Sequence, residues 1–208
     1  MILSRRVLLR HAFISASALS LARFVSAQDA VLLNGIPFYS QEDRNAPSGY
    51  DCGESCFRML LLWRANALGI DPSTVMSVDA ISALWGKPLG ALSWANDQYQ
   101  HMAELGFTGE YSESATADWY RAQIDAGYPC VALVTYGGFE PHNRANGVSD
   151  GHYVVVVGYD ADGFVIHDSA WYSEREGAYR HISAREWLYS SQGVSISITG
   201  FISSAYDV

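Results

Sequence analysis

The chain has 208 residues, of which 49% are hydrophobic, and it carries 13 basic and 22 acidic residues for a formal net charge of −9. An acidic surface of this kind repels nucleic acid and anionic lipid, so the composition argues against both as partners and favours neutral or cationic ones. The sequence has no internal repeat and no low-complexity linker that would divide it into several domains.

Residues 1–27 have the features of an export signal. Ser4-Arg5-Arg6 provides a basic start, an apolar run follows over 12–25, and small residues end the segment at Ala27. The paired arginines favour the twin-arginine route, with an ordinary Sec-type signal as the alternative. The apolar run is too short, and too interrupted by Arg23, to span a bilayer of about 30 Å, so we expect no stable membrane anchor after cleavage.

Residues 28–208 are therefore expected to form a single exported domain, in the periplasm or outside the cell. Loss of the leader removes four arginines and no acid, which leaves nine basic and 22 acidic residues and a net charge near −13. Three cysteines remain, so in an oxidising compartment at least one thiol stays free unless it pairs between chains. A Cys56–Cys130 disulfide and a reduced Cys56 are both compatible with the sequence.

The first predicted elements are an extended segment over residues 30–39 and a helix that starts near Cys52. Pro37 places the extended segment at the edge of a sheet, because proline cannot donate a backbone hydrogen bond. In the helix, Arg58 and Arg64 are expected to lie in solvent. The core-facing residues are spaced three and four apart, as one face of a helix requires, and are Cys56, Met59, Leu60 and Trp63.

Cys52 falls in the first turn of this helix. The unpaired N–H groups and the positive end of the helix dipole stabilise a thiolate at that position, whereas a thiol inside the helix would gain nothing. Cys52 is therefore a candidate nucleophile. The alternative is a small buried core residue, since free cysteines are among the most buried residue types.

The rest of the chain alternates between helical and extended patterns. A long connection without a regular pattern, residues 137–151, is expected to contact a ligand or substrate. A helix-rich first half and an antiparallel second half predict an α+β domain. Helices are predicted over 78–85, 94–105 (inner face Trp94, Met102 and Leu105), 116–126 and, from the Ser183–Glu186 capping box, to about 190; strands over 107–111, 129–136, 152–159, 164–168, 179–182 and 194–203.

His152 and Asp168 lie on the two strands of a predicted hairpin around Asp162-Gly163. The two side chains share a face only if the loop is odd or a bulge supplies the same offset, and a G1 bulge at Gly163 would supply it. We therefore predict an imidazole oriented by a carboxylate, with Nδ1–H bonded to Asp168 and Nε2 free to accept a thiol proton. Alternatively, they are an ordinary strand-start histidine and a turn residue.

The other histidines suggest no chemistry. His167 is predicted to point to the face opposite Asp168 and to pack there, while His101 and His181 have no candidate partner nearby in the sequence. No histidine or cysteine pair has the spacing of zinc ligands, so we predict neither a metal nor another cofactor.

Taken together, Gln41, Asp51-Cys52-Gly53, Gly151-His152-Tyr153 and Asp168 resemble the papain-like cysteine peptidases that cut double-glycine leaders from bacteriocin precursors, and their exported relatives. The resemblance runs from about residue 36 to the capped helix near 187. It implies a papain-like fold with the nucleophile helix packed on an antiparallel sheet. It also implies that Cys52 is the nucleophile, His152 the general base and Asp168 its orienting acid, and that the Gln41 side chain forms an oxyanion hole with the Cys52 N–H.

Two features depart from the family pattern. Glu54 stands in the first helical turn where relatives carry proline or a neutral residue, and its carboxylate would oppose a thiolate. The leader peptidases normally precede the membrane spans of a transporter, and this sequence shows none.

These patterns predict an exported cysteine peptidase that hydrolyses peptide bonds through an acyl-thioenzyme. The alternatives are an acyl or peptidyl transferase or a cell-wall amidase on the same scaffold, and a catalytically silent peptide-binding domain. A peptide or protein substrate is the expected partner, while the oligomeric state stays open. Trp171 is a candidate shield for the His152–Asp168 bond, and the candidate subsite aromatics are Tyr50, Phe139 and Tyr172.

Overall fold

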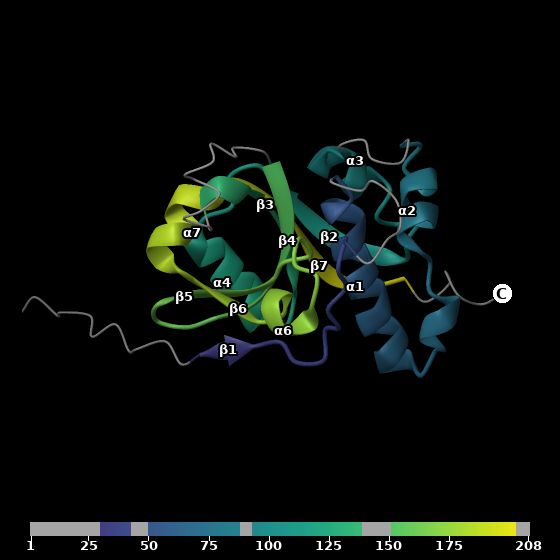
Figure 1. The fold of residues 1–208 in the computed structure, drawn as a ribbon, viewed down its shortest axis with the longest axis horizontal. Helices are drawn as coiled ribbons and strands as arrows, with labels where there is room; N and C mark the ends of the chain where they lie inside the picture. The colour runs from purple at the N-terminus through teal and green to yellow at the C-terminus, as the bar shows by residue number, and fades with distance from the viewer. Residues whose placement is uncertain (1–29, 43–49, 88–92, 139–150, 203–208) are drawn as a thin grey trace, which may run out of the picture.

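The computed structural model describes residues 30–42, 50–87, 93–138 and 151–202 (Figure 1). The predicted leader, residues 1–27, lies outside these ranges, as do residues 139–150 of the connection that was expected to contact a ligand.

The described residues form one antiparallel sheet with helices on both faces, which confirms the predicted α+β class. The strand order is β2-β7-β3-β4-β5-β6, and β1 pairs with the far end of β4. The strands are β1 (Val31–Leu32), β2 (Phe107–Ser112), β3 (Cys130–Thr135), β4 (Gly151–Tyr159), β5 (Gly163–His167), β6 (Arg180–Ser183) and β7 (Ser191–Phe201). The helices are α1 (Cys52–Leu68), α2 (Val78–Leu84), α3 (Ala95–Gln100), α4 (Ala117–Asp125), α6 (Glu174–Gly177) and α7 (Ala184–Ser190), with 3₁₀ turns η1 (Pro72–Thr74) and η2 (Tyr136–Gly138).

The helices cover the sheet in two groups. Helices α1, α2 and α3 lie on one side, and α4 and α7 lie on the other (Figure 1). Each side has its own apolar core, and Cys56 belongs to the first core whereas Cys130 belongs to the second. The three cysteines are free thiols, and the sheet separates Cys56 from Cys130, so the structure does not contain the disulfide that the sequence left open.

Helix α1 begins at Cys52 and buries most of the predicted face, with Trp63 half-buried, but the expectation that both of its arginines lie in solvent was wrong. Arg58 is half-buried, and its guanidinium donates to the Val75 carbonyl at 3.2 Å. Cys56, Met59 and Leu60 are fully buried, as their spacing predicted. Arg64 was expected in solvent but is also buried, because its guanidinium donates to the Gly106 and Ile202 carbonyl oxygens at 2.7 Å each. The cation thus satisfies backbone acceptors beside the ends of β2 and β7, which sequence spacing alone does not reveal.

Two other elements are shorter than predicted. Of the extended segment, only Val31–Leu32 forms a strand, and Leu33 adds one hydrogen bond to the Val157 carbonyl at 2.8 Å. Gly35 then takes a left-handed conformation (φ 80°) and turns the chain away. Helix α3 ends at Gln100, and the turns that follow it bury Met102 and Leu105 as expected. Trp94, predicted on the inner face, precedes the helix and is 67% exposed.

Strands β4 and β5 form the predicted hairpin, and their register contains one extra residue in β4. Val155 lies opposite His167, whereas Gly158 lies opposite Val165. Two residues of β4 therefore face one residue of β5 between these pairs, which is the definition of a bulge.

The bulge has the predicted effect at a different place. It lies within β4 and not at Gly163, whose carbonyl accepts the Asp160 N–H at 3.1 Å and closes the turn regularly. The one-residue offset still places His152 and Asp168 in the same alternating set of side chains. The prediction that these two side chains lie on the same face is therefore correct, although the bulge that produces this arrangement was assigned to the wrong strand.

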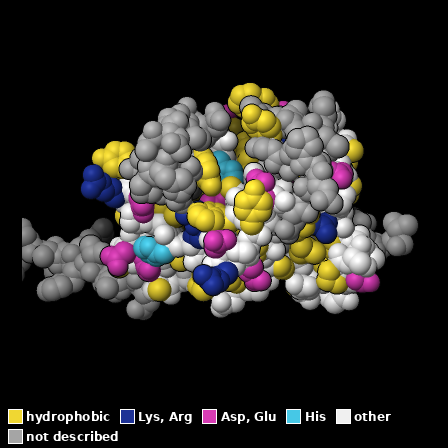
Figure 2. Space-filling model, in the orientation of Figure 1, with side chains coloured by type: hydrophobic (Ala, Val, Ile, Leu, Met, Phe, Trp, Pro, Cys, Tyr) yellow, Lys and Arg dark blue, Asp and Glu magenta, His cyan; other side chains and the backbone are white. Residues whose placement is uncertain are grey.

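The acidic side chains are dispersed. On the face shown in Figure 2, those of the described residues are spread over several elements and do not gather into one patch. Within the described ranges, no helix combines the length and the hydropathy needed to cross a bilayer.

Candidate active site

Cys52 is the first residue of α1 and is 6% exposed. Asp51 precedes it at the N-cap, and the Asp51 carbonyl accepts the Ser55 N–H at 2.9 Å, so the helix is hydrogen-bonded from its first turn. The sulfur therefore lies where the sequence placed it, at the positive end of a 17-residue helix.

His152 and Asp168 are in direct contact. Nε2 of His152 lies 2.8 Å from Oδ1 of Asp168, and the two residues are 5% and 0% exposed. The prediction that Nδ1 would bond the carboxylate was wrong. Asp168 lies beyond the end of β5 and meets the ring nitrogen farther from the His152 backbone, so Nδ1 is the nitrogen that does not face the carboxylate. The Cys52 side chain acts on the same ring and favours its charged form, as Asp168 does.

The contacts of His152 favour its charged form. Burial alone disfavours an imidazolium, but the charge and hydrogen bond of Asp168, together with the hydrogen bond and charge of Cys52, outweigh burial and raise the pKa of His152 to about 10. Tyr136 covers the imidazole edge-on, with ring centroids 4.7 Å apart. An imidazolium that persists at neutral pH is the counterion that a thiolate requires.

Gln41 is held by the residue that follows Asp168. Its side-chain oxygen accepts the Ser169 hydroxyl at 3.0 Å, and its backbone N–H donates to the Ser169 carbonyl at 2.9 Å. Both residues are buried. Because Ser169 donates to the oxygen, the amide Nε2 is the donor, and it lies 3.5 Å from Oε1 of Glu42. Sequence analysis missed Ser169, because a serine after a strand gives no signal of a partner 128 positions away.

Arg180 is a second residue that sequence analysis missed. Its guanidinium bonds Oδ2 of Asp168, the oxygen that does not face His152. Trp171, the predicted shield of the His152–Asp168 bond, packs against this guanidinium, with 4.8 Å between the charged carbon and the ring centroid. The Ala170 N–H completes the environment of Asp168 by donating to Oδ1 at 3.1 Å.

Glu54 is buried on the side of α1 that faces α2. It forms an ion pair with Lys87, and Ser82 donates a hydrogen bond to the same carboxylate at 3.2 Å. Burial raises the pKa of Glu54, and Lys87 opposes this rise. The carboxylate that was expected to oppose a thiolate therefore has a cation of its own.

A pocket of about 300 Å³ opens beside Cys52. Of the predicted subsite aromatics, Tyr50 lines it, Tyr172 is 73% exposed elsewhere, and Phe139 lies outside the described residues. None of the described residues that line it is charged. The lining consists of Tyr50, Cys52, Ser93, Trp94, Leu133, Gly151, Tyr153 and Gln192.

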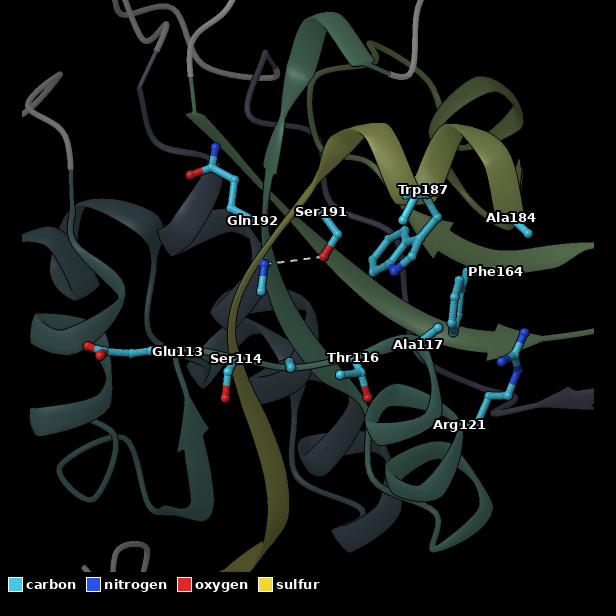
Figure 3. Close-up of a pocket in the computed structure, with 13 residues that line it drawn as sticks. Glu113, Ser114, Thr116, Ala117, Arg121, Phe164, Ala184, Trp187, Ser191 and Gln192 are labelled. Atoms are coloured by element: carbon cyan, nitrogen blue, oxygen red, sulfur yellow. Dashed lines mark hydrogen bonds between the residues drawn. The ribbon is translucent and has the colours of Figure 1, made fainter.

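A larger cavity of about 550 Å³ lies between the starts of α4, α7 and β7 (Figure 3). Phe164 and Trp187 form part of its wall, with Arg121 at one side. It meets the Cys52 pocket only at Gln192, and neither Cys52 nor His152 lines it. The smaller pocket is therefore the one beside Cys52.

Three other histidines lie among the described residues. His101 pairs with Glu104 and His181 with Asp160, each at 3.1 Å on the surface. Within the described ranges, no three metal-binding side chains come together. His167 is fully buried, as predicted, and its ring lies 4.5 Å from that of Tyr179.

Burial without a hydrogen-bond partner among the described residues lowers the pKa of His167 to about 4. The folded chain therefore resists protonation that the unfolded chain accepts below about pH 6.5, so stability falls as the pH drops from 6.5 towards 4. We expect a loss of about 2 kcal/mol between pH 7 and pH 5 from this residue. Urea unfolding at several pH values tests this, with His167→Leu expected to remove that part of the slope. The same slope in His167→Leu as in the parent would contradict it, and exposed His181→Ala is the control.

A helix that begins at Cys52, packed on an antiparallel sheet with His152 on β4 and Asp168 just beyond the end of β5, has the architecture of papain-like cysteine peptidases. The sequence matches the Peptidase_C39 like family over residues 33–194, and the chain belongs to this family.

Ten chains of solved structures match the fold, including two that match over most of their length. One is described as a C39-like peptidase from Bacillus anthracis: identity is 18%, the TM-score is 0.52, and the match covers 83% of this chain and 98% of that one. The other is xylellain, a cysteine protease from Xylella fastidiosa, with 15% identity, a TM-score of 0.51, and coverage of 84% and 87%. No curated protein matches the chain in sequence. The predicted fold, a nucleophile helix on an antiparallel sheet, is confirmed.

Proposed function

We propose that the chain is an exported cysteine peptidase that hydrolyses peptide bonds with Cys52, His152 and Asp168. The observation that carries the proposal is that one buried imidazole bonds the Asp168 carboxylate at 2.8 Å, while the Cys52 side chain at the start of α1 also favours the charged form of that imidazole. Membership of a peptidase family supports the same reading. Export rests on the features of residues 1–27.

The proposed reaction has two stages, acylation of Cys52 and hydrolysis of the acyl-thioenzyme. The Cys52 thiolate attacks the carbonyl carbon, and the oxyanion that forms accepts hydrogen bonds from Nε2 of Gln41 and the Cys52 N–H. Nδ1–H of the His152 imidazolium then protonates the leaving amine, and an acyl-thioenzyme remains. Nδ1 next takes a proton from water, whose oxygen attacks the thioester and releases the acid. Asp168 keeps the ring oriented throughout by accepting from Nε2.

The pocket beside Cys52 supports a substrate with a bulky apolar side chain near the scissile bond. Tyr50, Trp94 and Tyr153 supply aromatic surface, and about 300 Å³ is ample for a large side chain. A double-glycine substrate would leave this space empty, so processing of bacteriocin leaders is the less favoured specificity.

The proposal is tested by incubating residues 28–208 with a peptide library and identifying products by mass spectrometry. We expect the cleaved bonds to lie close to large apolar residues, on their carboxyl side. We expect no cleavage by Cys52→Ala. Products joined to an added amine, without free acid, would indicate a transferase on the same scaffold. Cleavage that survives in Cys52→Ala would refute the proposal.

The oxyanion role of Gln41 makes a separate prediction. Gln41→Ala should lower kcat about 10²-fold or more with little change in KM, because one donor to the oxyanion is lost. Ser169→Ala should lower kcat about fivefold, since it removes one neutral hydrogen bond, worth about 1 kcal/mol, that orients the Gln41 amide. Steady-state kinetics measures both, with the exposed Ser73→Ala as control. A wild-type kcat in Gln41→Ala would rule out the oxyanion role.

A further inference from the structure

Asp168 is shared between two cations. Its Oδ1 faces Nε2 of His152 at 2.8 Å, and its Oδ2 bonds the guanidinium of Arg180. The carboxylate is fully buried, and the Arg180 side chain is 17% exposed. Removing a carboxylate from water is costly unless cations and hydrogen bonds replace the water, and here both oxygens are occupied.

The charges in this cluster balance only when Arg180 is included. In the reactive form the Cys52 thiolate and the Asp168 carboxylate carry two negative charges, and the His152 imidazolium carries one positive charge. The Arg180 guanidinium, which stays protonated in proteins, supplies the second positive charge. A buried cluster with a net charge of −1 would favour uptake of a proton, which would quench the thiolate.

The fold holds Arg180 in place from several sides. Trp171 packs on the guanidinium at 4.8 Å. Tyr179, just before it, adopts a left-handed backbone conformation (φ 51°) that starts β6. The Gly177 carbonyl accepts the Asp168 N–H at 2.8 Å, so the last residue of α6, three positions before Arg180, is fixed to Asp168.

Other titratable groups also face this cluster. Tyr136 from η2 and Glu186 from α7 act electrostatically on Arg180. Cys56, which is on α1, lies near Asp168. Glu186 accepts hydrogen bonds from the backbone and hydroxyl of Ser183 in its capping box. Burial raises the pKa of Cys56 well above its usual value, so that thiol stays neutral.

We propose that Arg180 is a positioning residue that offsets the charge of Asp168 and turns Oδ1 towards His152, so that Cys52, His152, Asp168 and Arg180 form a charge-neutral group of four. The inference rests on the proposed function, because it concerns the reactive form of the same site. Its consequence is that Arg180 keeps the thiolate populated at low pH without touching the substrate.

The test measures the rate at which iodoacetamide alkylates Cys52 as a function of pH, with the modified residue identified by mass spectrometry. Arg180→Met removes one positive charge at similar volume, so we expect the midpoint of the rate profile to move up by about one pH unit, a tenfold slower reaction below the midpoint. Arg180→Lys should keep the parental midpoint. Arg185→Met, an exposed arginine on α7, controls for the loss of charge alone.

Asp168→Asn supplies the opposite change and does not depend on the folding of Arg180→Met. This substitution leaves an excess positive charge in the group of four, so the midpoint of the alkylation-rate profile should move to lower pH. In the double variant with Arg180→Met, the midpoint should return towards the parental value. An unmoved midpoint in folded Arg180→Met, or an unmoved or raised midpoint in Asp168→Asn, would overturn the role of Arg180. An ordinary thiol profile for Cys52 in the parent would instead refute the proposed function.

Discussion

His152→Ala is expected to lower kcat/KM about 10³-fold or more while leaving the fold intact. The reason is that one ring both stabilises the thiolate and delivers the proton to the leaving amine, and general acid–base catalysis alone contributes about 10²- to 10⁴-fold. The ring is also the group through which Asp168 acts on the sulfur, since Asp168 bonds its Nε2 at 2.8 Å. Initial rates with a peptide identified from the library measure the effect.

The pH profile gives a second readout of the same residue. Because the pKa of His152 is raised to about 10, the parent should keep its activity across neutral pH and lose it as the pH rises through that value. The stability that His152 contributes should follow the same course, being present below about pH 6.5 and lost as the pH approaches 10. His181→Ala, a surface histidine paired with Asp160, is the matched control. Parental rates in His152→Ala would remove His152 from the mechanism.

Lys87→Met is expected to destabilise the fold by about 3–5 kcal/mol, because it leaves the buried Glu54 carboxylate without its cation. Lys87 is the only lysine in the 208-residue sequence, and its side chain is 6% exposed. It also approaches the Tyr50 carbonyl at 3.4 Å, so it ties the start of α1 to the end of α2.

A double-mutant cycle separates the ion pair from simple packing. Glu54→Gln with Lys87→Met should recover most of the lost stability, because neither charge is then buried alone. Urea denaturation of the two single variants and the double variant measures the coupling. If the double variant loses as much as the sum of the single variants, the two side chains do not interact as an ion pair.

Local rules predicted most of the elements. The three- and four-residue spacing of Cys56, Met59 and Leu60 identified the buried face of α1. Thr116 and Ser183 cap α4 and α7 as their sequence contexts predicted, since capping depends on residues only three positions apart.

Contacts between distant elements could not be predicted in the same way. The pairing of His152 with Asp168 was accessible, because strand parity within one hairpin limits which side chains can meet. Which ring nitrogen of His152 bonds Asp168 depends on the path of the chain beyond β5, and the wrong nitrogen was predicted. Arg180 and Lys87 meet their carboxylates only through tertiary packing.

The long charged side chains show the same limit. Arg64 was assigned to solvent from its charge, yet its guanidinium reaches two carbonyl oxygens in the folded chain. A periodic pattern reports where the Cα atoms face, whereas an arginine can place its charge well away from its own Cα atom. Buried cations therefore have to be read from the fold.

The central claim, that Cys52 forms a covalent acyl intermediate, is tested most directly by acid-quenching residues 28–208 with a cleaved peptide during turnover and measuring the intact mass. The expected result is an adduct equal to the acyl portion of the peptide, localised to Cys52 and absent from Cys52→Ala. Two results would contradict the account. One is cleavage of the peptide under single-turnover conditions with no adduct on Cys52, and the other is an adduct on another residue.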